Sequence, residues 1–286
     1  MEDSRPRSRV GFLLLALAAV LVTGVIVMRW PTMVSLTDPP AATELVQLGA
    51  TAPSSALPPS TSRARSTSAK PAGTTGTLTT RNSSNRTGAY YLPSEHKGEP
   101  RPLLVAIHGT GGNGSQMVEF FRDAAARESF FIVAPDSRLS PAGQYTWQVG
   151  DHPGDVTEDL EHVARCVEEL RAMDGVRLDL ARVLVVGHSG GASTAPYVAS
   201  NREPYTAFAV LHGGVFAGGL GPRRMRGWFS TGDADPLRPP AGVQQAADDT
   251  RSAGFRDVVY REFHGGHGIG PEELNALMAW WLDRGR

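Results

Sequence analysis

The chain has 286 residues, which is enough for one large domain or two small ones. Its 28 Lys and Arg residues nearly balance its 29 Asp and Glu residues, so the formal net charge is -1 and nothing electrostatic favours nucleic acid as a partner. One cysteine excludes an internal disulfide framework and a thiolate metal cluster.

An uncharged apolar segment occupies residues 10–28, directly after three arginines. As a helix it would be about 28 Å long, close to the roughly 30 Å of a bilayer's hydrocarbon core. The preceding arginines predict a cytoplasmic N-terminus, so residues 1–30 are expected to form a cytoplasmic stub and transmembrane signal-anchor, with the rest of the chain extracytoplasmic. A cleaved signal peptide, which would give a secreted protein, is the alternative, although its apolar region usually has only about 7–15 residues.

Residues 31–80 are rich in Pro, Ser, Thr and Ala and contain few large apolar side chains. Such a segment buries too little surface to offset the entropy lost on ordering. We therefore predict a disordered tether that leads to a single catalytic-sized domain at residues 81–286.

Short apolar runs bounded by Gly, Pro or Asp recur through residues 81–286. They lie at residues 103–107, 130–134, 183–186, 207–211, 225–230 and 258–263. This is the pattern of buried parallel strands. Amphipathic segments separate them, and this alternation predicts an α/β fold with a doubly wound, mostly parallel sheet.

Two of the predicted helices have clear boundaries. The segment 155–173 has apolar residues at helical spacing, with Asp155 expected at the N-cap and Cys166 beside the buried stripe as a small core residue. The last helix is expected to begin at Pro271, because proline fits the first helical position and two glutamates follow it.

The most informative stretch is Gly187-His188-Ser189-Gly190-Gly191, which follows an apolar strand and precedes a helix. The G-x-S-x-G pattern on a sharp strand-to-helix turn exposes the serine at the carboxyl edge of a sheet, and larger residues two positions away would collide. The sequence therefore predicts Ser189 as a nucleophile, with the Gly190 amide facing the charge that develops on an attacked carbonyl.

A serine nucleophile needs a base and an acid that orients the base. His267 lies in a glycine-rich loop between the last strand and the last helix, and we prefer it to His264, which is nearer the strand. Asp235 is preferred as the acid because Pro236 holds it extended, whereas Asp233 is expected to brace the turn. His212 closely follows a strand, where a polar core or edge role is expected.

The loop from His108 to Gly114 has two interpretations. A strand that ends in His-Gly-x-Gly-Gly can place the Thr110 backbone N–H beside the nucleophile as the second half of an oxyanion hole. The same glycines fit G-x-G-x-x-G, and Asp136 follows the next strand, so a dinucleotide-binding oxidoreductase is an alternative. That alternative leaves the later Ser, Asp and His segments unexplained.

Taken together, these motifs resemble those of serine hydrolases in the α/β-hydrolase superfamily. The chain is most similar to the group of polyhydroxybutyrate depolymerases, feruloyl esterases and related carboxylesterases, over about residues 89–286. The motifs that carry the likeness are Pro102–Gly109, Val133–Asp136, Arg182–Gly191, Gly232–Pro236 and Gly266–Gly268. The resemblance implies the α/β-hydrolase fold, a Ser189–His267–Asp235 triad, Thr110 and Gly190 as oxyanion donors, and no metal or organic cofactor.

The sequence thus predicts a carboxylic ester hydrolase that acts through an acyl-enzyme on a small-molecule or polymeric ester. Peptidase, lipase and thioesterase specificities remain open on the same residues. Tyr145 and Trp147, in the loop 137–154, are candidates for a substrate wall, or they pack under that loop. The alternative from another class is a surface-tethered, hydrolase-like binding domain without turnover.

Overall fold

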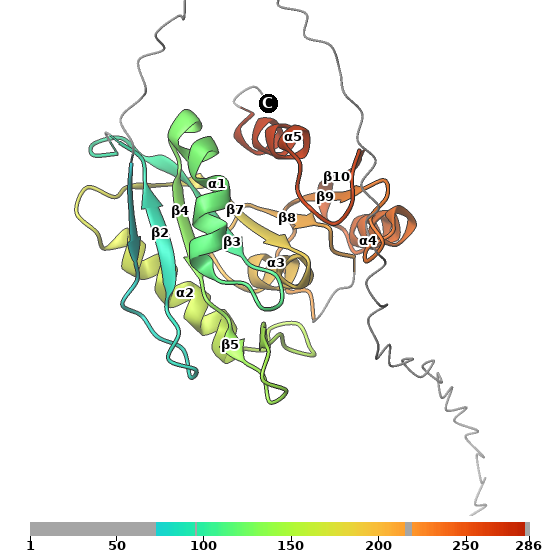
Figure 1. Cartoon of the computed structure of the whole chain (residues 1–286), viewed down its shortest axis with the longest axis horizontal. Helices are drawn as coiled ribbons and strands as arrows, with labels where there is room; N and C mark the ends of the chain where they lie inside the picture. The colour runs from blue at the N-terminus through green and yellow to red at the C-terminus, as the bar shows by residue number, and fades with distance from the viewer. Residues whose placement is uncertain (1–72, 95, 215–218, 284–286) are drawn as a thin grey trace, which may run out of the picture. The chain divides into compact units, whose positions relative to one another are not determined.

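The computed structural model describes residues 73–94, 96–214 and 219–283, all within one compact unit (Figure 1). The segment 10–28, predicted to be a membrane anchor, lies outside the described residues, as does nearly all of the predicted tether. None of the helices described has the length and apolar character needed to cross a membrane.

An eight-stranded sheet forms the centre of the described domain, in the order β1-β2-β4-β3-β7-β8-β9-β10. β1 pairs antiparallel with β2 and β2 antiparallel with β4, whereas all other neighbours are parallel. The strands of this sheet are β1 (Thr74–Thr77), β2 (Gly88–Leu92), β3 (Arg101–Ile107), β4 (Phe131–Pro135), β7 (Leu178–His188), β8 (Ala207–Leu211), β9 (Arg226–Gly232) and β10 (Arg256–Phe263). A separate hairpin joins β5 (Arg138–Leu139) to β6 (Tyr145–Thr146). The predicted parallel sheet is confirmed.

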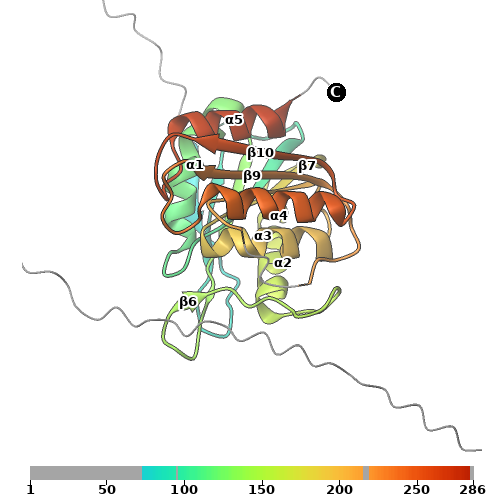
Figure 2. The ribbon, with the colours of Figure 1, turned by 90° about the vertical axis from the view of Figure 1, so that its right-hand side faces the viewer.

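Helices cover both faces of the sheet, as the edge-on view shows (Figure 2). One face is packed by α2 (Glu158–Arg171), α3 (Gly190–Asn201) and α4 (Pro240–Ser252). The other is packed by α1 (Gly114–Glu128) and α5 (Pro271–Leu282). This is the doubly wound arrangement that the alternating pattern predicts, and α5 begins at the predicted Pro271.

The central strands are apolar on both faces because both faces are covered. Successive side chains of β3 alternate between the two cores: Leu103 and Val105 enter the core under α2 and α3, whereas Leu104 enters the core under α1 and α5. Cys166 on α2 is buried in the first core as expected, and burial raises the pKa of its thiol to about 12.

Two predicted boundaries were wrong. The ordered domain begins before residue 81, because β1 at Thr74–Thr77 extends the sheet from within the stretch assigned to the tether. Its polar, exposed sequence carries no strand pattern and depends on pairing with β2. Asp155 is not the N-cap of α2: Thr157 is, and its Oγ1 accepts from the Leu160 N–H at 3.2 Å. Asp155 instead accepts from the His152 N–H, one turn before the helix.

Candidate active site

Ser189 occupies a sharp turn between β7 and α3. Its φ of 53° and ψ of -116° are unfavourable for a residue with a side chain, so the surrounding structure must hold it there. A Cβ at Gly187 would overlap the Gly191 carbonyl, and one at Gly191 would overlap the carbonyls of β3. Only glycine fits at both positions, which explains the sequence pattern around the serine.

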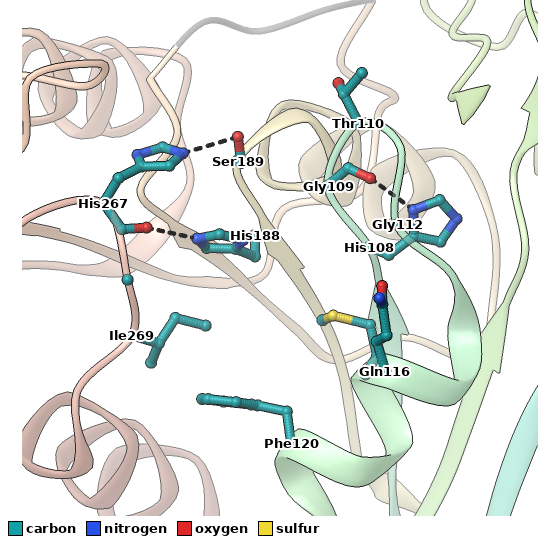
Figure 3. A pocket seen from close by; sticks show the side chains of 12 residues that line it. His108, Gly109, Thr110, Gly112, Gln116, Phe120, His188, Ser189, His267 and Ile269 are labelled. Carbon is teal, nitrogen blue, oxygen red and sulfur yellow. Dashed lines mark hydrogen bonds between the residues drawn. The ribbon is translucent and has the colours of Figure 1, made fainter. Parts of the chain in front are cut away.

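Three predicted residues come together at the carboxyl edge of the sheet, and Figure 3 shows two of them, Ser189 and His267. The Ser189 hydroxyl lies 2.9 Å from Nε2 of His267, in position to donate to it. Nδ1 of His267 donates to Asp235, at 2.8 Å from Oδ2 and 3.1 Å from Oδ1. The geometry therefore links a hydroxyl, an imidazole and a carboxylate in the order needed to activate the hydroxyl.

Asp235 is almost fully buried, at 3% exposure. Its Oδ1 also accepts from the backbone N–H groups of Leu237 and Arg238, both at 2.9 Å. Burial alone would raise the pKa of this carboxyl, but hydrogen bonds from His212, His267 and the two amides outweigh burial and hold the pKa well below its usual value. The carboxylate is thus fixed in direction and ionised.

The alternative pair, Asp233 and His264, lies apart from Ser189. Asp233 accepts from the Gly265 N–H at 3.0 Å and lies 3.2 Å from Nδ1 of His264, whose side chain is 97% exposed. These contacts brace the loop that carries His267. The preference for Asp235 and His267 agrees with the geometry, and the expected bracing role of Asp233 is present.

His188 links the turn at Ser189 to the loop that carries His267. Its Nε2 donates to the His267 carbonyl at 3.0 Å (Figure 3). Burial lowers the pKa of His188, against the opposing effect of that hydrogen bond, and so favours the neutral ring. The sequence predicts only that His188 lies in this turn. Its contact with His267 joins residues far apart in the chain, so no local sequence pattern indicates it.

Thr110 and Gly190 lie side by side next to Ser189. A Cβ at Gly190 would fall 3.2 Å from the Thr110 backbone nitrogen. Among the hydrogen bonds within the described ranges, neither backbone N–H has an acceptor. Two free N–H groups beside a serine hydroxyl, one of them at a helix N-terminus, are suited to bind a developing oxyanion.

A cavity of about 580 Å³ opens beside Ser189 and His267. Its apolar wall consists of Met117 and Phe120 from α1 and Ile269 from the loop before α5. Figure 3 shows Phe120 and Ile269 facing each other below Ser189. No sequence pattern indicates this wall, because it is built from α1 and from a loop more than a hundred residues later.

The predicted substrate wall of Tyr145 and Trp147 was wrong, because neither residue lines this cavity. Trp147 is buried, and its Nε1 donates to the His108 carbonyl at 2.8 Å. The Tyr145 carbonyl accepts from the Gly111 N–H at 2.9 Å, while its ring packs against the Arg86 guanidinium. Both residues therefore support the glycine loop from behind, which is the packing role left open above.

The surroundings of Asp136 disfavour the dinucleotide alternative. Its Oδ1 accepts from the Gly114 N–H at 2.7 Å, at the start of α1, and lies 3.7 Å from Arg86. The carboxylate that would hold a ribose is therefore already occupied in fixing the glycine loop. His212, Asp235 and His267 have ligand atoms close enough to share a cation, but the imidazole N–H groups donate to the carboxylate there.

Comparison with known proteins adds to this geometry. The model of the alpha/beta hydrolase family matches residues 104–285. The protein named "Putative esterase NocK" from Nocardia uniformis subsp. tsuyamanensis is 27% identical over 175 residues, or 58% of this chain and 48% of that protein. The chain thus spans about half the length of this curated relative.

Solved structures share the fold. An esterase from the archaeon Pyrobaculum calidifontis superposes with a TM-score of 0.56 at 17% identity, covering 75% of this chain and 85% of that one. A fungal esterase structure from Rhizomucor miehei superposes with a TM-score of 0.57 at 16% identity, covering 76% of this chain and 84% of that one.

Proposed function

The chain belongs to the alpha/beta hydrolase family, and from that premise we propose that it hydrolyses carboxylic esters through an acyl-enzyme. The observation that carries this proposal is the hydrogen-bonded chain from Ser189 through His267 to Asp235. The names of the related proteins above, which are esterases, support the same activity.

In the proposed first half-reaction, Ser189 Oγ attacks the ester carbonyl carbon while its proton passes to Nε2 of His267. The N–H groups of Thr110 and Gly190 stabilise the oxyanion of the tetrahedral intermediate. The intermediate collapses, the bond to the alkoxy group breaks, and the leaving oxygen takes the proton from His267. An alcohol departs and Ser189 keeps the acyl group.

In the second half-reaction a water molecule attacks the acyl carbon and gives its proton to His267. The second tetrahedral intermediate expels Ser189 Oγ, which recovers the proton, and the carboxylic acid leaves. Asp235 remains ionised throughout and stabilises the imidazolium that forms in each half. No step requires a metal or an organic cofactor.

The cavity favours compact, apolar ester substrates. Met117, Phe120 and Ile269 offer only hydrocarbon, sulfur and aromatic surface to the group beside Ser189. A volume of about 580 Å³ accommodates a short acyl chain or one aromatic ring with its linker. We therefore propose short-acyl and aryl esters as the substrate class in preference to long-chain lipids.

We further propose that the domain acts outside the cytoplasm, attached to the membrane by residues 10–28. The proposal depends on the length of that uncharged segment and on the arginines before it. Release of the protein from membranes by alkaline carbonate, or an N-terminus of the mature protein beyond residue 28, would contradict the anchor.

The test is turnover of p-nitrophenyl acetate and p-nitrophenyl butyrate by the wild type and by Ser189→Ala. We expect Ser189→Ala to reduce kcat by at least about a thousandfold, since the nucleophile is lost. Retained activity would overturn the assignment of Ser189. A binding domain without turnover is distinguished by a fluorophosphonate probe, which such a domain should not capture.

A further inference from the structure

Four neighbouring parallel strands each lead into one residue of a continuous hydrogen-bonded chain. Ser189 follows β7, His212 follows β8, Asp235 follows β9 and His267 follows β10. His212 therefore comes from the strand that separates Ser189 from Asp235. Its side chain, 1% exposed, lies behind Asp235, with Nδ1 at 2.8 Å from Oδ2 of that carboxylate.

The other ring nitrogen of His212 faces a second buried carboxylate. Nε2 lies 3.1 Å from Oε2 of Glu273, in the first turn of α5, and the Glu273 side chain is also 1% exposed. Oε1 of Glu273 accepts from the Ser230 hydroxyl at 2.6 Å. That hydroxyl in turn accepts from the Trp228 indole N–H at 2.9 Å, so its own hydrogen is directed to Glu273.

These partners determine the protonation of the ring. An ionised carboxylate can only accept hydrogen bonds, so a ring between two ionised carboxylates must donate from both nitrogens. A histidine that donates from both nitrogens is an imidazolium. Burial by itself would lower the pKa of His212, but hydrogen bonds to Glu273 and Asp235 outweigh burial and raise it.

The backbone holds His212 in place at some cost. Its φ of 53° is in the left-handed region, which a side chain disfavours. Its N–H donates to the Ser230 carbonyl at 2.8 Å, and the Leu211 carbonyl beside it accepts from the Ser189 N–H at 3.0 Å. One turn thus supports both the nucleophile and the imidazole behind Asp235.

We propose that His212 and Glu273 are positioning residues, whose buried ion pair holds the Asp235 carboxylate toward His267 and sets the pH at which His267 can act as a base. The proposal rests on the proposed role of Ser189, His267 and Asp235. It assigns to the buried pair an effect on the reaction that acts through its contact with Asp235 and through the charge of His212 beside His267.

The direction of the effect follows from the charges around His212. The titratable groups that face it are Asp235, Glu273, His188 and His267, with both histidine rings centred 5.6 Å from its own. His188 is favoured in its neutral form, so the cluster holds two anions and one cation. The cationic member of the ion pair is the His212 ring, which contacts Asp235 and lies beside His267. The ion pair therefore opposes protonation of His267.

Removing the pair's cation should therefore make His267 easier to protonate. We expect His212→Asn and Glu273→Gln each to move the acid limb of the pH–rate profile upward by about 0.5–1 pH unit. Glu273→Gln can keep an N–H donor toward Asp235, through a neutral His212 protonated on Nδ1. His162→Asn is the matched control: His162 on α2 is fully buried and bonded to the Thr87 carbonyl, away from the Ser189–His267–Asp235 chain.

The first measurement is independent of turnover. Long-range ¹H–¹⁵N spectra of the histidine-labelled full chain in detergent should show one histidine that remains an imidazolium at pH 8. That signal should be absent in His212→Asn and become a neutral ring in Glu273→Gln. A wild type in which every histidine is neutral at pH 8 would overturn the proposal.

The second measurement is the rate of fluorophosphonate labelling as a function of pH. At pH 7 we expect His212→Asn to label up to about tenfold more slowly than the wild type, which is the most that an acid limb moved by about 0.5–1 pH unit gives, and His162→Asn to label at the wild-type rate. If His212→Asn does not fold, the acid limb of the pH–rate profile of Glu273→Gln decides whether the ion pair affects His267. Variants that fold and keep the wild-type pH–rate profile would overturn the positioning role of His212 and Glu273 but not the proposed function. A wild type that never labels would instead overturn the proposed function, and the spectra would still report on the ion pair.

Discussion

Asp235→Asn is the substitution that most sharply tests how His267 is oriented. The wild-type carboxylate accepts from His267, from His212 and from two backbone N–H groups. An asparagine of the same shape has one acceptor oxygen and turns an NH₂ group toward these donors. His267 would then be driven to the tautomer that is protonated on Nε2, which cannot accept the Ser189 proton.

The magnitude follows from the geometry. With Oδ2 at 2.8 Å from Nδ1, the carboxylate and imidazolium charge centres are about 4 Å apart, which gives about 4 kcal/mol at an effective dielectric of about 20. Each 1.4 kcal/mol is about tenfold in rate, so this charge term alone is worth about a thousandfold, and the wrong tautomer brings the expected loss to between about 10³ and 10⁴ in kcat.

The assay is kcat and KM for p-nitrophenyl acetate at pH 8, with Asp233→Asn as the matched control. Asp233 is half exposed and contacts only the loop around His264 and Gly265, so its loss should change kcat by less than about threefold. A kcat of Asp235→Asn within about tenfold of the wild type would show that Asp235 does not orient His267, as would an equal loss of kcat in Asp233→Asn.

Three other predictions concern the cavity and the core. Phe120→Ala should raise KM for p-nitrophenyl butyrate by about 5- to 20-fold while kcat changes little, because the apolar wall is truncated and Ser189 is untouched. A fall in kcat at constant KM would contradict the place of Phe120 in the cavity wall. Burial raises the pKa of Asp159 to about 6, so the folded chain binds a proton at this carboxyl more tightly than the unfolded chain does. The contribution of Asp159 to folding stability is therefore present below about pH 4 and is lost as the pH rises through about 6. Asp159→Asn should therefore stabilise the protein at pH 8 by about 1–3 kcal/mol in urea titrations, less at pH 5; a gain that does not depend on pH would contradict a buried charge as its cause. Cys166 should resist iodoacetamide at pH 8 until the protein unfolds, because its thiol is buried and its pKa is about 12, and mass spectrometry of a native sample showing alkylation would contradict this.

The parts of the fold that were predictable are those with a local cause. The buried strands could be identified because both faces of the sheet are covered, which makes β8 apolar throughout and β3 apolar after Arg101. The turn at Ser189 was predictable because backbone crowding allows only glycine at positions 187 and 191. The sequence preference for Asp235 had a local reason, the restriction that Pro236 places on the residue before it, and Asp235 is the aspartate that contacts His267.

The parts that were not predictable arise from packing between distant segments. β1 is polar and exposed, and it is a strand only because β2 lies beside it. The cavity wall joins Phe120 to Ile269, and the ion pair joins His212 to Glu273, across 149 and 61 positions of the chain. Neither pair has a spacing that a sequence pattern could reveal. For the same reason the sequence left open whether Trp147 forms a substrate wall or packs under its loop.

The central claim is that Ser189 is the nucleophile, and the most direct measurement is the site of covalent capture. The full chain and Ser189→Ala are treated with a fluorophosphonate, weighed intact and mapped by peptide mass spectrometry. We expect one adduct per wild-type chain, located on Ser189, and no adduct on Ser189→Ala. An adduct on another residue, or equal labelling of Ser189→Ala, would contradict it.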